Sequence, residues 1–105
     1  MTYSFHPDAR LEYKEAAVFY ENRRSGLGAA FTKEIESAID RVLQAPERWR
    51  VVDQDVRRCL VHTFPFGILY TIESDSILIV SVMHLRRKPN YWRARLSDSI
   101  APRSK

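Results

Sequence analysis

Cysteine is almost absent from this sequence of 105 residues, which contains only Cys59. A lone cysteine cannot close a disulfide within the chain, and it cannot hold a metal ion without other ligands. Histidine is also scarce. The three histidines, His6, His62 and His84, lie far apart in the sequence and without paired carboxylates. The sequence therefore argues against a disulfide scaffold and a zinc finger, and we expect neither a metal nor a cofactor.

Long apolar runs are missing as well. No segment approaches the ~20 residues that a membrane-spanning helix needs. The first eight residues lack the basic and then apolar pattern of a secretory signal, so we expect a cytoplasmic protein without a membrane partner. The length corresponds to one domain over residues 1–105, with a core over 3–96 and a frayed tail over 97–105.

Acidic residues are few in the second half of the chain. Residues 1–55 carry 8 basic and 10 acidic side chains, whereas residues 56–105 carry 9 basic and 3 acidic ones. Thirteen of the 17 cations are arginines, whose planar guanidinium groups bind phosphate and carboxylate and stack on aromatic rings. This half of the chain suits nucleic acid or an acidic protein partner, and a solvated surface is the plainer interpretation.

The spacing of apolar residues predicts two helices. A short strand over 3–5 leads through His6-Pro7-Asp8 into a helix whose apolar positions repeat with helical periodicity as far as Tyr20. The turn around Gly26 and Gly28 separates it from a second helix that ends near residue 43. Two amphipathic helices joined by a short glycine turn predict an antiparallel hairpin.

The rest of the sequence is typical of strands. Residues 45–55 are interpreted as a polar loop, and strands are expected over 56–64, 66–73 and 77–83, followed by a short helix over 89–96. The order β-α-α-β-β-β predicts an α+β fold. In this fold the helical hairpin packs on one face of a small, mostly antiparallel sheet, with a short C-terminal helix.

Basic and aromatic residues gather near the ends of the predicted strands. They are Arg57, Arg58 and His62 on the second strand, Tyr70 on the third, and His84, Arg86, Arg87, Lys88, Tyr91, Trp92, Arg93 and Arg95 at and beyond the fourth. Cations interleaved with Tyr and Trp can hold phosphates and stack bases. Strand alternation places Arg58 and His62 on one face of the sheet and Arg57 on the other.

Structural roles are the alternative for each of these residues. His84 could form a hydrogen bond at a sheet edge, and Tyr70 could belong to the core, as could Tyr91. The two strand arginines could pair with nearby acids of the preceding loop. Trp92 could be an anchor that packs the C-terminal segment onto the sheet.

Six segments occur in an order that resembles one known group of proteins. They are Phe5-His6-Pro7-Asp8-Ala9, Gly26-Leu27-Gly28 in the helix hairpin, Ala45-Pro46-Glu47-Arg48-Trp49, Val56-Arg57-Arg58-Cys59-Leu60, Phe64-Pro65-Phe66-Gly67-Ile68-Leu69-Tyr70 and the ending Val82-Met83-His84-Leu85-Arg86-Arg87-Lys88-Pro89-Asn90-Tyr91-Trp92. Over about residues 3–96 the chain resembles the RelE/ParE superfamily of type II toxin–antitoxin toxins. The resemblance implies the fold predicted above and a growth inhibitor that a cognate antitoxin neutralises.

The resemblance implies one of two targets. RelE-like toxins cut messenger RNA on the ribosome without a metal, and here Arg58, His84, Arg86 and Tyr91 would be the catalytic residues. ParE-like toxins bind DNA gyrase and cut nothing. In either case the other basic and aromatic residues would contact the target or RNA. They are Arg57, His62, Tyr70, Arg87, Lys88, Trp92, Arg93 and Arg95.

One departure from the RelE-like pattern favours the second target. RelE-like nucleases commonly carry an arginine early in the third strand, where this sequence has Gly67. Without that phosphate-binding group, catalysis would lose a large electrostatic contribution. We therefore expect a ParE-like inhibitor of DNA gyrase. A ribosome-dependent mRNA endonuclease and a degenerate toxin that only binds its antitoxin are the alternatives.

Overall fold

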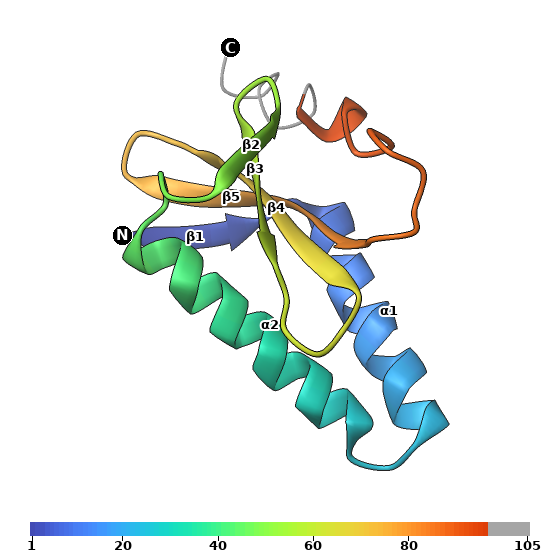
Figure 1. Cartoon of the computed structure of the whole chain (residues 1–105). Helices are drawn as coiled ribbons and strands as arrows, with labels where there is room; N and C mark the ends of the chain where they lie inside the picture. Colours follow the sequence, from blue (N-terminus) through green and yellow to red (C-terminus); the bar gives the residue numbers. More distant parts are fainter. Residues whose placement is uncertain (97–105) are drawn as a thin grey trace.

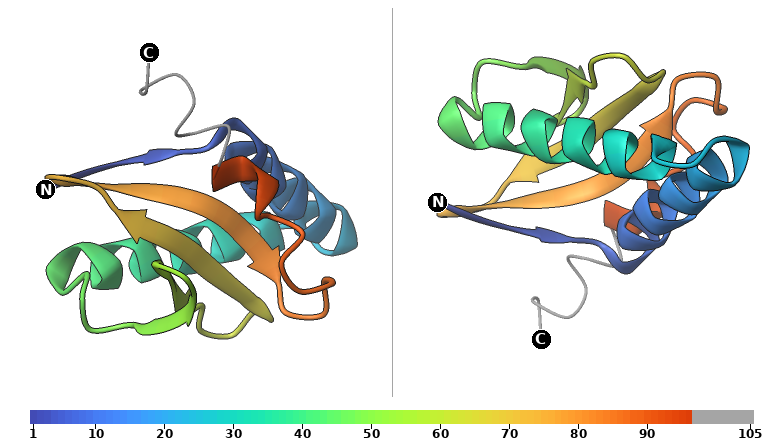
Figure 2. Two further views of the ribbon diagram at one scale, coloured as in Figure 1. Left: turned by 90° about the horizontal axis from the view of Figure 1, so that it is seen from above. Right: turned by 90° about the horizontal axis from the view of Figure 1, so that it is seen from below.

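Two helices cover one face of a five-stranded sheet in the computed structural model, which describes residues 1–96 (Figures 1 and 2). The elements are β1 (Thr2–Phe5), α1 (Pro7–Arg23), α2 (Leu27–Gln44), β2 (Arg50–Asp53), β3 (Val56–Leu60), β4 (Phe66–Ile72) and β5 (Ser76–His84). The strand order is β1-β5-β4-β3-β2, and only β1 and β5 are parallel neighbours. The predicted fold class is confirmed. The predicted tail, 97–105, lies outside the described residues.

The sheet has one strand more than the sequence predicted. Residues 45–55 were expected to form a loop, but Arg50–Asp53 pair antiparallel with β3 as the strand β2. This strand is only four residues long and its register is interrupted by a bulge, so it leaves little period-2 signal in the sequence. The expected C-terminal helix is present as short helical turns, in which Arg93 N donates to Asn90 O and Leu96 N to Arg93 O.

The helical hairpin is fixed at both ends of its first helix. The Nδ1 atom of His6 accepts a hydrogen bond from Asp8 N, and Pro7 occupies the first helical position. At the turn, the carboxylate of Glu21 accepts hydrogen bonds from Gly26 N and Gly28 N. These contacts hold α2 directly against α1.

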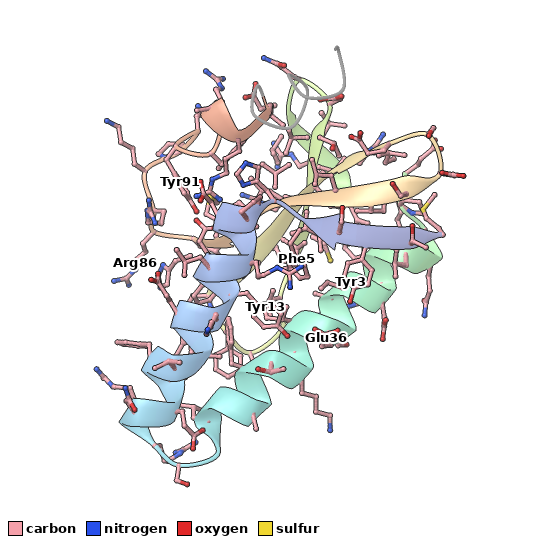
Figure 3. The ribbon with its side chains drawn as sticks, turned by 180° about the vertical axis from the view of Figure 1, so that it is seen from behind. Tyr3, Phe5, Tyr13, Glu36, Arg86 and Tyr91 are labelled. Atoms are coloured by element: carbon pink, nitrogen blue, oxygen red, sulfur yellow. The ribbon has the colours of Figure 1, made fainter. Side chains whose placement is uncertain are left out.

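A contact between side chains joins the helices again near the sheet. The hydroxyl of Tyr13 on α1 donates to Glu36 Oε2 on α2 over 2.7 Å (Figure 3). Burial and the nearby carboxylate raise the pKa of Tyr13, so the hydroxyl stays a donor. The rings of Phe5 and Tyr13 pack beside this bond.

The core has two layers, because apolar side chains cover both faces of β4 and β5. The layer under the helices contains Phe31, Ile35, Ala38, Ile39 and Val42 from α2 with Cys59, Ile68, Tyr70, Ile77, Ile79 and Val82 from the sheet. The opposite face is covered by Val56, Leu69, Val80, Met83 and Trp92. The continuous apolar run of β5 is thus that of a strand buried on both faces, as predicted. Burial raises the pKa of the Cys59 thiol, which fits a packing role.

No helix within residues 1–96 has both the length and the apolar character needed to cross a membrane.

Candidate functional site at the C-terminal segment

Glu12 on α1 connects the first helix to the end of the chain. Its Oε1 accepts hydrogen bonds from Ser81 Oγ at 3.0 Å and Val82 N at 3.1 Å on β5. Arg95 donates to both carboxylate oxygens, with Nη1 at 2.8 Å and Nη2 at 2.9 Å. The hydroxyl of Tyr91 donates to Oε2 and lies 2.9 Å from Ser81 Oγ. Figure 3 shows Tyr91 directed toward the beginning of α1.

The electrostatics of this cluster are balanced internally. Burial alone raises the pKa of Glu12, but the hydrogen bonds from Arg95, Tyr91 and Val82 outweigh it, so the net pKa is lowered. Burial and the Glu12 carboxylate raise the pKa of Tyr91 to about 12. Arg95 also donates to Val80 O at 3.0 Å and lies 3.8 Å from Asp8. The cluster is therefore an ion pair with a neutral tyrosine.

Glu12 was not among the site residues predicted from the sequence. Its carboxylate meets partners that are 69 to 83 residues away in the chain, so no local motif contains them. The only local signal was its position early in a helix. An acidic residue is common there for another reason, because it interacts favourably with the helix dipole.

Three exposed cations follow β5, and two of them have defined contacts. The backbone N of Arg86 donates to His84 Nδ1 at 3.0 Å, which requires that nitrogen to be unprotonated. The ring of His84 packs edge-on against Phe66. The guanidinium carbon of Arg87 lies 3.8 Å above the ring of Tyr91. Lys88 is exposed as well, so Arg86, Arg87 and Lys88 form a basic turn of three consecutive exposed cations. Figure 3 shows Arg86 pointing away from the molecule.

Trp92 and Arg93 attach the same segment to the sheet. The side chain of Trp92 is 2% exposed and packs on Leu69, Val80 and Met83. Trp92 therefore packs the C-terminal segment onto the sheet, which was the structural alternative predicted for this residue. The exposed Arg93 donates from Nε to Asp53 Oδ2 on β2 at 2.7 Å, and this contact raises the pKa of Arg93. The side chain of Trp92 is therefore not accessible to a target in this arrangement, whereas that of Arg93 remains exposed.

Arg57 and Tyr70 also have structural roles. Arg57 Nη1 donates to Glu47 O at 2.9 Å and to Trp49 O at 2.7 Å, which fixes the segment between α2 and β2. Tyr70 is fully buried, and its hydroxyl donates to Pro46 O at 2.6 Å. Burial raises the pKa of Tyr70 to about 12. The prediction that Tyr70 contacts a target or RNA is wrong, because this residue has no exposed surface.

His62 does not share a face with Arg58, contrary to the expected alternation. Strand β3 ends at Leu60, so the period of two does not extend to His62. The ring Nε2 lies 3.1 Å from Arg41 Nη1 on α2, which places His62 on the side of the helices. Arg58 lies on the opposite face, where it lines a pocket with Leu69, Met83 and Trp92.

Gly67 leaves room that the side chain of Arg58 fills. A Cβ atom at position 67 would lie 3.2 Å from both Cγ and Cδ of Arg58 and 3.6 Å from Leu85 Cδ2. A larger side chain there would therefore require the side chain of Arg58 to shift.

The predicted residues thus separate into distinct surroundings. Tyr91 and Arg95 join Glu12 near α1, Arg58 lies on the face of the sheet opposite the helices, and His62 lies beside α2. Within residues 1–96, no hydrogen bond joins the side chains of any two of the four candidate catalytic residues, Arg58, His84, Arg86 and Tyr91. In the same range, no three His, Cys, Asp or Glu side chains are grouped as metal ligands.

Comparisons with known proteins agree with this fold. The family described as ParE toxin of type II toxin-antitoxin system, parDE, matches residues 3–89. A solved structure described as the chromosomal ParDE TA system from P. aeruginosa superposes with a TM-score of 0.72. At 12% identity, it covers 82% of this chain and 97% of its own, so the likeness concerns the fold. No curated protein matches the sequence. The family match covers most of the chain, and the protein belongs to the ParE toxins of type II toxin–antitoxin systems.

Proposed function

We propose that this toxin inhibits DNA gyrase by binding to it, without cutting nucleic acid itself. Membership of the ParE family supports a toxin whose partner is a cognate antitoxin. The choice of gyrase over the ribosome depends on what the site can do chemically. The observation that carries it is that, within residues 1–96, no hydrogen bond joins the side chains of any two of the four candidate catalytic residues, and that His84 and Tyr91 are each engaged in a separate structural contact.

RNA cleavage needs groups that this arrangement does not supply together. Attack by a 2′-hydroxyl requires cations on the phosphate and a group that moves protons. The hydroxyl proton of Tyr91 is engaged by Glu12, and with a pKa of about 12 this tyrosine is a poor base near neutral pH. Nδ1 of His84 is occupied by the backbone of Arg86. Gly67 supplies no side chain, and Arg58 occupies the space beside it.

The surface of the basic turn fits a binding role instead. Arg86, Arg87 and Lys88 are exposed, and the chain that follows them is anchored by Trp92 and by the contact of Tyr91 with Glu12. A cationic surface attracts an acidic partner. We therefore assign gyrase contact to this turn.

The antitoxin is expected to cover a different part of the surface. Leu11, Val18 and Phe19 on α1 are each more than half exposed, which is unusual for apolar side chains. An amphipathic helix or extended segment of the antitoxin that lies across these residues would bury them. Such a segment could also reach the basic turn and shield it.

A supercoiling assay tests the proposal directly. Purified toxin added to gyrase, relaxed plasmid and ATP should inhibit supercoiling with no ribosome present. The double variant Arg86→Ala/Lys88→Ala should need about tenfold more toxin, because two attractive charges are lost. The matched variant Arg24→Ala/Lys33→Ala removes two exposed cations elsewhere and should behave as the wild type.

The same preparation should leave messenger RNA intact on programmed ribosomes. Cleavage there, together with unaffected supercoiling, would identify a metal-independent ribosomal nuclease and refute the proposal. If the toxin affects neither gyrase nor RNA while it still binds its antitoxin, the degenerate-toxin alternative is correct.

A further inference from the structure

The sheet face opposite the helices has a small pocket. Its volume is about 150 Å³, and it lies between the sheet and the turn that follows β5. Its apolar walls are Val52, Leu69, Met83 and Trp92, and its polar groups are Arg58 and Asn90. Asn90 has a φ of 68°, so the chain turns sharply at the edge of the pocket. Apolar walls with two polar groups are the usual composition of a ligand site.

Two like charges lie beside the pocket. Arg58 on β3 is directly opposite Arg50 on β2, so both guanidinium groups extend on the same face. Like charges in this relation destabilise a sheet. Within residues 1–96, neither arginine forms an ion pair with an acidic side chain. An anion bound here would remove the repulsion.

The volume limits what the pocket can hold. A cavity of ~150 Å³ accommodates about one six-membered ring, whereas sites for larger ligands measure roughly 300–1,000 Å³. A nucleotide, with its base, sugar and phosphate, is too large to be enclosed. A ring or branched alkyl group with a carboxylate next to it matches both the walls and the charge.

We propose that this pocket binds the carboxyl terminus of a polypeptide that ends in an aromatic or branched apolar residue. The terminal side chain enters between Leu69, Met83 and Trp92, and its α-carboxylate pairs with the planar guanidinium of Arg58. Aspartate and glutamate side chains lack the apolar part, so an internal acidic residue would leave the walls unfilled. The assignment does not depend on which target the toxin inhibits.

A binding measurement on the isolated chain tests the pocket. N-acetyl-L-phenylalanine is titrated into the protein while the NMR signals of the Met83 methyl and the Trp92 indole are followed. We expect saturable shifts of both signals, and about tenfold weaker binding of the corresponding amide, which lacks the charge. Equal binding of acid and amide, or no saturation, would overturn the proposal. Tighter binding of uridine monophosphate would do the same and would indicate a phosphate site.

Variants separate the role of Arg58 from a general effect of charge. Arg58→Met keeps the aliphatic stem over Gly67 and should abolish the preference for the acid. Arg24→Met removes an exposed cation elsewhere and should leave the preference unchanged.

If Arg58→Met does not fold, Arg58→Lys keeps the charge and loses the bidentate geometry, and the preference for the acid should fall several-fold. An unchanged preference in the variant that folds would show that Arg58 does not bind the carboxylate. Growth inhibition is a separate readout, so failure here and failure of the gyrase proposal are distinguishable.

Discussion

Glu12 is the residue on which the position of the C-terminal segment depends. It accepts hydrogen bonds from two residues of β5 and from Tyr91 and Arg95 of the C-terminal segment. The side chains of Glu12 and Arg95 are only 15% and 12% exposed, so water contributes little to either charge. Removal of one partner therefore leaves the other charge buried.

We expect Glu12→Ala to lower the free energy of unfolding by about 3 kcal/mol, because the half-buried guanidinium of Arg95 would lose the carboxylate that accepts two of its hydrogen bonds. Urea denaturation measures the change. The matched variant Glu15→Ala removes an exposed carboxylate from the same helix and should stay within about 0.5 kcal/mol of the wild type. Similar values for the two variants would show that the cluster does not hold the segment.

The same carboxylate makes stability depend on pH. The folded pKa of Glu12 is below its ordinary value of 4.5, so its contribution is complete above that value and is lost as pH falls through the folded pKa. The wild type should thus lose more free energy of unfolding between about pH 5 and pH 3 than Glu12→Gln, which cannot titrate. Urea denaturation at the two pH values gives the comparison. Parallel losses would contradict the lowered pKa.

At the scale of elements, the hairpin is the clearest case of close packing. A Cβ atom at Gly28 would lie 2.6 Å from Ala17 O, which is a backbone atom and cannot rotate away. Gly26, in contrast, has open space around it but a φ of 89°. The two glycines are therefore required for different reasons, close approach and left-handed backbone.

Gly28→Ala should separate the helices and lower the free energy of unfolding by about 2 kcal/mol. Gly26→Ala should cost about 1 kcal/mol through backbone strain, and Gly26→Asn should cost less because asparagine tolerates this conformation. Thermal unfolding by circular dichroism ranks the three variants. A neutral effect of Gly28→Ala would mean that the helices are not in contact at this turn.

Elements with strong periodicity were predictable from the sequence, and short or interrupted ones were not. Helix α2 and the apolar strand β5 follow from spacing and from continuous hydrophobicity. Helix α1 has weaker periodicity, since Ala9 is its one fully buried residue. Strand β2 was missed because four residues with a bulge give no clear alternation. His62 was assigned to the wrong face because nothing local marks the end of β3 at Leu60. The anchor role of Trp92 was foreseen as an alternative, but its partners come from β3, β4 and β5 and depend on the complete sheet.

At the scale of the whole molecule, two surfaces are candidates for contact with partners. The basic turn, Arg86 to Lys88, follows β5, whereas the exposed apolar residues of α1 lie on the helical hairpin. Family membership and fold could be inferred from the ordered segments of the sequence, and the family match agrees. The target could not be inferred in this way, because one fold can support different activities. The gyrase proposal rests instead on the dispersed candidate catalytic residues and on Gly67.

Brief induction of the toxin in a bacterial host, followed by pulse labelling, tests this account most directly. Thymidine and amino-acid incorporation are compared in the first minutes, with Arg86→Ala/Lys88→Ala as the weakened control. Inhibition of gyrase predicts that thymidine incorporation falls first and that the control delays the fall. If amino-acid incorporation falls first, the ribosome is the target, and the conclusion drawn from Gly67 and the dispersed residues is wrong.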